Sequence, residues 1–319
     1  MFELFLENLA SPPILFFLLG IFSVFLKVGI RIPTDISKIL SLYLLIAIGF
    51  HGGYTLSHNG YAKSDIAFLM VGLAYAFLIP FFLFFILRTR FNVENSAAIA
   101  ASYGSVSAVT FLTAISFLEM IGESGSGKVT PLVALMESPS IIAALLLAGM
   151  YLKDKQHLNF KHLIHESIFN PSVYVLLGSL LAGILSGERG WLVVKPFTQD
   201  IFKGVLMIYL LDSGIHGAQE LRSLFRYGLF PFIFAIVVPI LGGSIGVYSA
   251  YLLNLSAGDS LLYAALFAGA SYIAVPAAMR LSLPKAEPSL YLSMSLGLTF
   301  PFNIGLGLPL YWYMIQALR

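Results

Sequence analysis

Small and hydroxyl-bearing residues interrupt two apolar stretches of this 319-residue chain, at YGSVSAVT (103–110) and GASYIAVPAA (269–278). A broken transmembrane helix exposes backbone N–H groups, and the half-helix that follows carries roughly half a positive charge at its N-terminus, which suits a small anion. Hydroxyl groups at the two breaks belong to Ser105, Ser107, Thr110, Ser271 and Tyr272. The alternative is that Gly, Ala and Ser simply let helices pack closely.

Oxygen-bearing side chains at membrane depth suggest a cation site. Glu137 precedes Pro139 in the middle of an apolar stretch, and Thr299 and Asn303 flank Pro301 in the last one. An ionisable residue inside a membrane is costly and is a functional candidate, as a sodium ligand or a proton carrier. Oxygen ligands suit a hard cation such as sodium, so Glu137, Thr299 and Asn303 are the predicted cation-binding residues. A protonated, hydrogen-bonded Glu137 is the alternative.

Histidines and one carboxylate give weaker signals. His51 and His216 occupy matching positions near stretch ends, and Asp212 lies close to His216. The sequence has no cysteine and no HExxH motif, so interfacial hydrogen bonding is favoured over metal binding for the histidines. Asp212 is as compatible with a structural pairing as with a cation site.

The segment GESGSGKVT (122–130) resembles a phosphate-binding loop, with Gly122, Gly127 and Lys128 at the right offsets. Val129 stands where such a loop needs Ser or Thr for magnesium, and no strand precedes it. We predict a flexible loop here, and no nucleotide-driven transport.

Composition requires a lipid environment. Hydrophobic residues make up 58% of the chain and charged residues 11%, with a mean hydropathy of +0.88. A soluble domain has about 25% charged residues, so most of this surface must face lipid. The basic residues are scattered, which excludes a nucleic-acid partner. The acidic N-terminus lacks the basic region of a cleaved signal peptide.

Ten apolar stretches are long enough to cross a bilayer. They cover residues 12–30, 36–56, 64–87, 94–120, 130–152, 170–187, 197–217, 225–253, 258–281 and 287–317. Lys and Arg number twelve in the loops on one side and five on the other, with Lys203 assigned to neither. The positive-inside rule then places the linker 153–169 in the cytoplasm and both termini outside, in a bacterial inner membrane.

An internal repeat relates the two halves, 1–152 and 170–319. IGFHGG (48–53) matches SGIHGA (213–218), and the openings at Ser11 and Asn170 are alike. Both third stretches carry a proline, both fourth stretches are interrupted, and both fifth stretches have a polar-then-proline step. Five helices per repeat force the halves into opposite orientations, so the predicted fold is all-α, with two inverted five-helix repeats broken in spans four and nine.

These segments resemble the sodium-dependent bicarbonate transporter superfamily over nearly the whole chain. The resemblance lies in AIGFHGG (47–53), YGSVSAVT, ALMESPSIIAALL (134–146), VPAAMRLSLPKAEPSLYL (275–292) and TFPFNIGLGLPLYW (299–312). It implies ten helices in inverted repeats, bicarbonate between two crossed broken helices with sodium nearby, and a trimer.

Carried over by position, Gly104, Ser105 and Ser107 match the family's small-Ser motif, and Ser271 matches a serine of the second break. Glu137 stands where cyanobacterial members have Asp before a proline. Tyr272 and Ala274 replace an Asp and a Ser, so the resemblance implies a divergent, non-cyanobacterial type of member with a weaker or relocated sodium site. The short linker 153–169 does not support regulation by a PII-like partner.

The sequence thus predicts a secondary active transporter that imports a small anion, bicarbonate by resemblance, in symport with a sodium ion. A carrier of another small organic or inorganic solute and an anion channel remain alternatives. An enzyme is not predicted, because no nucleophile–base or metal-ligand constellation occurs at membrane depth.

Overall fold

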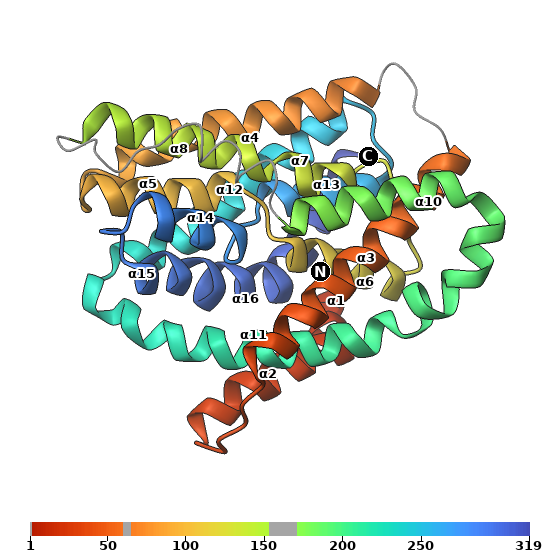
Figure 1. The fold of residues 1–319 in the computed structure, drawn as a ribbon, viewed down its shortest axis with the longest axis horizontal. Helices are drawn as coiled ribbons and strands as arrows, with labels where there is room; N and C mark the ends of the chain where they lie inside the picture. The colour runs from red at the N-terminus through yellow and green to blue at the C-terminus, as the bar shows by residue number, and fades with distance from the viewer. Residues whose placement is uncertain (1, 60–64, 153–170) are drawn as a thin grey trace.

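A computed structural model describes residues 2–59, 65–152 and 171–319, and every regular element in these ranges is a helix (Figure 1). The predicted linker 153–169 lies outside the described residues. The helices before it are α1 (Phe2–Leu9), α2 (Pro12–Phe25), α3 (Thr34–Asn59), α4 (Asp65–Leu87), α5 (Val93–Gly104), α6 (Ala108–Met120), α7 (Pro131–Leu135) and α8 (Glu137–Tyr151).

The second half is also helical, with short 3-10 and π segments. Its elements are α10 (Pro171–Lys195), η1 (Pro196–Asp200), α11 (Phe202–Leu224), η2 (Phe225–Tyr227), α12 (Phe230–Leu252), α13 (Ala257–Phe267), α14 (Ala274–Ser282), α15 (Pro288–Leu292), η3 (Ser293–Thr299), α16 (Phe300–Phe302), η4 (Asn303–Gly307) and α17 (Leu308–Leu318).

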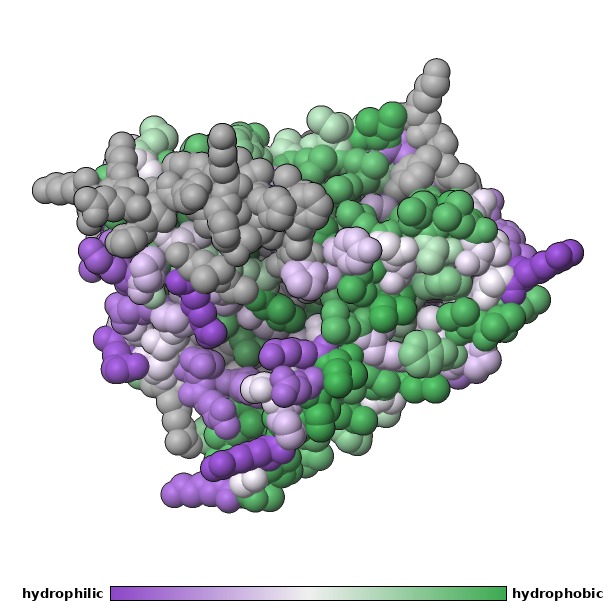
Figure 2. Space-filling model, in the orientation of Figure 1, coloured by the Kyte–Doolittle hydropathy of each residue, from purple (hydrophilic) through white to green (hydrophobic). Residues whose placement is uncertain are grey.

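Six of the described helices are long and apolar enough to cross a membrane, or seven if the bent pair α1–α2 is counted as one span. Most of the predicted stretches 170–187 and 197–217 falls within one continuous helical run, Val173–Tyr227, and α13 (Ala257–Phe267) is shorter than a membrane-spanning helix. Large apolar side chains such as Phe82 and Leu185 are 67% and 77% exposed. Apolar residues cover much of the face seen in Figure 2, as expected for a multi-pass membrane protein.

The first two long helices of each half pack against those of the other half: α3 lies along α10, and α2 along α11 (Figure 1). Glycine permits both contacts at backbone distance. A Cβ added at Gly49 would lie 2.6 Å from the Leu176 carbonyl oxygen, and one at Gly214 would lie 2.2 Å from that of Phe17. Small residues are the usual means of close helix packing in membranes.

Prolines inside the helices free backbone carbonyl groups, and polar side chains satisfy them. Pro239 interrupts α12 and has no N–H for the carbonyl group of Ala235, four residues before it. The Thr299 hydroxyl donates to this carbonyl oxygen instead, at 2.7 Å. Pro309 has the same effect on Gly305, whose carbonyl accepts a hydrogen bond from the Asn8 amide at 3.0 Å. These bonds hold the C-terminal helical segments next to the breaks.

Candidate functional site

Both predicted helix breaks are present, and they lie against each other. α5 ends at Gly104 and α6 begins at Ala108, while α13 ends at Phe267 and α14 begins at Ala274. The Ser271 backbone N–H donates to the Ser102 carbonyl at 2.8 Å, which joins the second break to the end of α5. This carbonyl is available because its usual partner four residues later falls outside the helix.

A central cavity of about 30 Å³ opens where the two breaks meet. It is lined by Ser41, Leu45, Val106, Ser107, Ala108, Val133, Ala134, Glu137, Val173, Leu176, Ser271, Tyr272 and Ile273. The volume exceeds the 10–15 Å³ or so that a water-sized species needs. Four of the predicted site residues therefore share one cavity: Ser107, Glu137, Ser271 and Tyr272.

Hydroxyl protons are available to a ligand in the central cavity. The Ser107 oxygen accepts bonds from the Thr110 N–H at 3.1 Å and the Thr110 hydroxyl at 2.9 Å, so its own proton stays free to donate. The Ser271 oxygen likewise accepts from the Val275 N–H at 3.3 Å. The Tyr272 hydroxyl is buried beside the hydroxyl groups of Ser107 and Ser213.

Helix ends supply the positive potential of the central cavity. Ser107 is the N-cap of α6 and Ile273 the N-cap of α14, and both line the cavity. Each N-terminus contributes roughly half a positive charge. Among the described lining residues none is Lys or Arg. An anion would therefore be held by helix ends and hydroxyl groups.

Glu137 supplies the one carboxylate among the described lining residues. It is the first residue of α8, follows the short helix α7 and is partly buried. Neither an ion pair nor a hydrogen bond joins its side chain to another described residue. A carboxylate that faces a cavity beside an anion site is chemically suited to a metal cation of single charge.

Thr299 and Asn303, the other two predicted cation ligands, lie outside the central cavity. The Thr299 hydroxyl lies 2.7 Å from the Tyr103 hydroxyl in addition to its bond to Ala235. The Asn303 amide donates to the Ala268 carbonyl at 2.7 Å, and its oxygen accepts from Tyr311 at 3.1 Å. Both side chains thus support the ends of broken helices.

Gly104, Ser105 and Thr110 lie around the first break without lining the central cavity. A Cβ at Gly104 would come within 2.5 Å of Pro80 and of the Ser140 hydroxyl, so glycine lets α5 approach α4 and α8. The Ser105 hydroxyl is buried and has no hydrogen-bond partner among the described residues. Thr110 acts on the cavity through its bonds to Ser107.

A family comparison decides the identity. The model of the Na+-dependent bicarbonate transporter superfamily matches residues 12–316. The chain belongs to this superfamily. No curated protein sequence matches it. Membership identifies a transporter with membrane-embedded helices, which agrees with the resemblance in its motifs.

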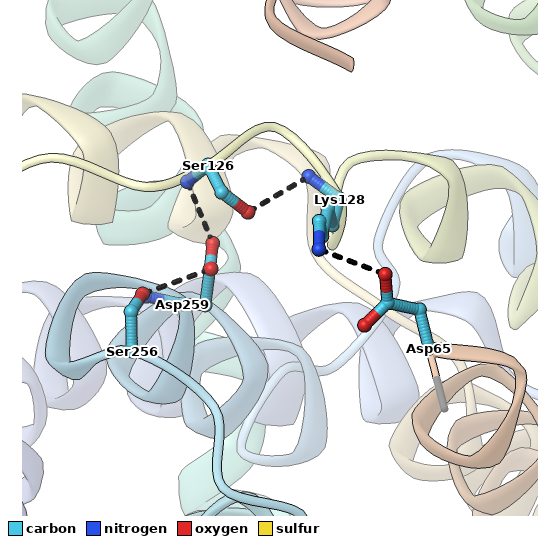
Figure 3. Close-up of polar contacts among 5 residues, drawn as sticks. All are labelled: Asp65, Ser126, Lys128, Ser256 and Asp259. Carbon is cyan, nitrogen blue, oxygen red and sulfur yellow. Dashed lines mark hydrogen bonds and ion pairs between the residues drawn. The ribbon is translucent and has the colours of Figure 1, made fainter. Parts of the chain in front are cut away.

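In this superfamily member, the loop 121–130 is anchored, so the prediction of a flexible loop is wrong (Figure 3). The Asp259 carboxylate accepts the Ser126 N–H at 2.8 Å and the Ser256 hydroxyl at 2.8 Å. Lys128 forms an ion pair with Asp65 at 2.8 Å. The lysine that resembles a nucleotide ligand therefore connects the loop to the start of α4.

The two matched histidines of the transporter differ in their surroundings. His216 Nδ1 lies 3.0 Å from the Asp212 carbonyl oxygen and 3.2 Å from the Asp212 carboxylate, whose buried Oδ1 atom has no hydrogen-bond partner among the described residues. His51 Nδ1 is buried and finds no partner among the described residues, so the predicted interfacial hydrogen bond is not present at this atom.

Sequence reasoning missed Ser41 of α3 and the contribution of α10 to the cavity wall. Ser41 lies in an ordinary apolar stretch, and no local pattern separates it from a packing residue. Its position facing the breaks depends on how α3 packs in three dimensions.

Proposed function

We propose that this transporter imports bicarbonate in symport with sodium. The observation that supports it most directly is the central cavity, where two half-helix N-termini, the hydroxyl groups of Ser107, Ser271 and Tyr272, and one carboxylate converge. Helix N-termini and hydroxyl groups favour an oxyanion, and the carboxylate favours a cation. One small cavity therefore offers complementary groups to both ions.

In this proposal Ser107, Ser271 and Tyr272 donate hydrogen bonds to the anion. Gly104 and Thr110 keep the first break in shape, and the Ser105 hydroxyl is a further donor if the break moves during transport. Glu137 holds the sodium ion. Thr299 and Asn303 support the cation site through the carbonyl groups that they bind.

Binding of the two ions should be mutually dependent. Two helix ends offset only about one unit charge, and a bound anion beside Glu137 would create strong repulsion without a cation. Each ion should therefore increase the affinity for the other by the same factor, typically 5- to 150-fold. Such reciprocity is a thermodynamic basis for symport.

The proposed architecture has ten spans in two inverted repeats. It is supported by the way the two halves pack on each other. The second helix of each half contacts the first helix of the other half, α3 on α10 and α11 on α2, through the glycines Gly49 and Gly214 at matching sequence positions. Loops of each half are likewise bound by helices of the other half. Asp259 of α13 binds the loop after α6, and Asn95 of α5 binds the Glu287 N–H in the loop after α14 at 2.7 Å. We further propose a bacterial inner-membrane location and, from family resemblance, a homotrimer.

Uptake of labelled bicarbonate into proteoliposomes, with and without an inward sodium gradient, tests the function. Saturable uptake that follows the sodium gradient is expected. Uptake that is linear in concentration would indicate a channel, and uptake of another solute in preference to bicarbonate would indicate a different carrier. The variant Ser57→Ala, at an exposed position of α3, is a suitable control for reconstitution.

A further inference from the structure

Two further cavities lie beside the helices that form the central cavity. An outer cavity of about 740 Å³ is lined by the α1–α2 junction, α6 and α11. A second cavity of about 40 Å³ lies between α3, α6, η1 and α11. Lys203 of α11 lines both, so the two cavities are neighbours with a cationic side chain between them.

Helices α3 and α6 line both the smaller cavity and the central cavity. On α3, Leu45 lines the central cavity, and His51 lines the smaller one six residues further on. On α6, Ala108 lines the central cavity and Glu119 the smaller one. At 1.5 Å per residue these separations are about 9 Å and 17 Å. The outer and smaller cavities both lie C-terminal to the central cavity along α6.

Three ionisable side chains meet in the smaller cavity. The Lys203 ammonium lies 2.9 Å from the Glu119 carboxylate, and these side chains are 57% and 38% exposed. His51 adds the buried Nδ1 atom that lacks a partner, and Gln199 adds an amide. A buried polar atom without a partner is rare in proteins and requires an explanation. A ligand in this cavity would provide one.

We propose that His51, Glu119, Gln199 and Lys203 form a second, vestibular binding site for a small oxyanion that carries a proton. Lys203, which also pairs with Glu119, attracts such an anion, while His51 Nδ1 and the Gln199 amide bind its oxygen atoms. The O–H group of the anion donates to Glu119, which would otherwise repel it. Identification of the anion as bicarbonate rests on the proposed function.

This arrangement discriminates by hydrogen bonding. Nitrate and chloride have no O–H group, so they would leave the Glu119 carboxylate facing a negative charge without a hydrogen bond. A site whose buried polar groups need a donor rejects ligands without one far more strongly than a difference in size would. The vestibular site would therefore concentrate bicarbonate near the central cavity and exclude competing anions.

Trp191 offers a direct signal for binding, since its ring centroid lies 4.9 Å from that of His51. The chain has two tryptophans, so Trp312→Phe leaves Trp191 as the reporter. Purified protein is titrated with sodium bicarbonate at constant pH, sodium concentration and ionic strength, and sodium nitrate is the comparison. We expect a saturable change in fluorescence with bicarbonate and none with nitrate.

Variants assign the signal to the site. Lys203→Gln and His51→Asn should abolish the fluorescence change, and in proteoliposomes they should raise KM for bicarbonate at least about fivefold with little change in kcat. Lys195→Gln removes an equal charge from the exposed end of α10 and should alter neither measurement. Glu119→Gln should let nitrate produce a signal, because it removes the repelling charge. A single symmetric peak in size-exclusion chromatography confirms that each variant is folded.

Failure of this proposal can be separated from failure of the proposed function. Ser271→Leu fills the central cavity and should stop uptake while the Trp191 signal remains. A bicarbonate signal from a protein that transports no bicarbonate would contradict the function and leave the vestibular site standing. Sodium-driven bicarbonate uptake with no Trp191 signal, and with KM unchanged in Lys203→Gln, would overturn the vestibular site alone.

Discussion

Side chains in the central cavity differ in whether they contribute to protein stability, to ion binding or to both. The Ser107 oxygen accepts two hydrogen bonds from Thr110 and so fixes the start of α6, and its hydroxyl group lies beside that of Tyr272. Glu137 has no such structural bond to a described residue. A change at Ser107 should therefore affect both stability and anion affinity, whereas a change at Glu137 should act directly on cation affinity and on the anion only through the coupling between the two ions.

Ser107→Ala should raise KM for bicarbonate about tenfold, the effect of one hydrogen bond to a charged group. It should also lower the unfolding free energy by about 1 kcal/mol through loss of the N-cap. Ser256→Ala is the matched control, because Ser256 caps α13 through the Asp259 N–H without lining the central cavity. It should lose stability and keep its KM. An unchanged KM in Ser107→Ala would remove this hydroxyl from the anion site.

Glu137→Gln should raise the sodium concentration for half-maximal uptake about tenfold or more, since a neutral amide is a poorer ligand for a hard cation. Sodium-dependent uptake rates at saturating bicarbonate measure this. Glu94→Gln, also in the first turn of a helix, is the control. If the sodium dependence of Glu137→Gln matched that of the control, the carboxylate would have a structural role only.

Among the helical elements, packing of α3 on α10 depends on glycine. Gly49→Ala places a Cβ 2.6 Å from the Leu176 carbonyl oxygen, so the helices must separate. Overpacking of this kind costs about 1–3 kcal/mol, and the thermal unfolding midpoint should fall by several degrees. Gly178→Ala on α10 meets nothing within 4 Å and should be neutral or slightly stabilising. Equal midpoints for both variants would show that this contact is looser than described.

For the whole molecule, the orientation can be tested with single cysteines, because the sequence contains none. Glu123→Cys, in the loop after α6, should react with a membrane-impermeant maleimide added to intact cells. Arg90→Cys, in the loop after α4, should react only after the membrane is opened. The excess of Lys and Arg on one side is the reason. Labelling of Arg90→Cys in intact cells, with Glu123→Cys protected, would reverse the topology.

The sequence was sufficient for the two breaks and for Glu137 as a carboxylate at membrane depth, because small residues and an intramembrane carboxylate are local signals, while its position beside the breaks was implied only by the family resemblance. It was insufficient for Thr299 and Asn303, whose partners are carbonyl groups in α12 and at the end of α13. The anchored loop was missed for the same reason, since Ser126 and Asp259 are 133 residues apart. Contacts of this range follow from tertiary packing and leave no pattern in the neighbouring residues.

The contacts between the first two long helices of one half and those of the other also affect the synthesis of the protein. α3 ends at Asn59, and its partner α10 ends at Lys195, which is translated 136 residues later. At about 5–20 residues per second the ribosome needs roughly 7–27 s to make that segment. During this interval the glycine-containing faces of α2 and α3 are without the helices they contact in the folded protein. The first half is therefore in the membrane without its partner helices during this interval, and the transporter completes its fold only after α10 and α11 have been inserted.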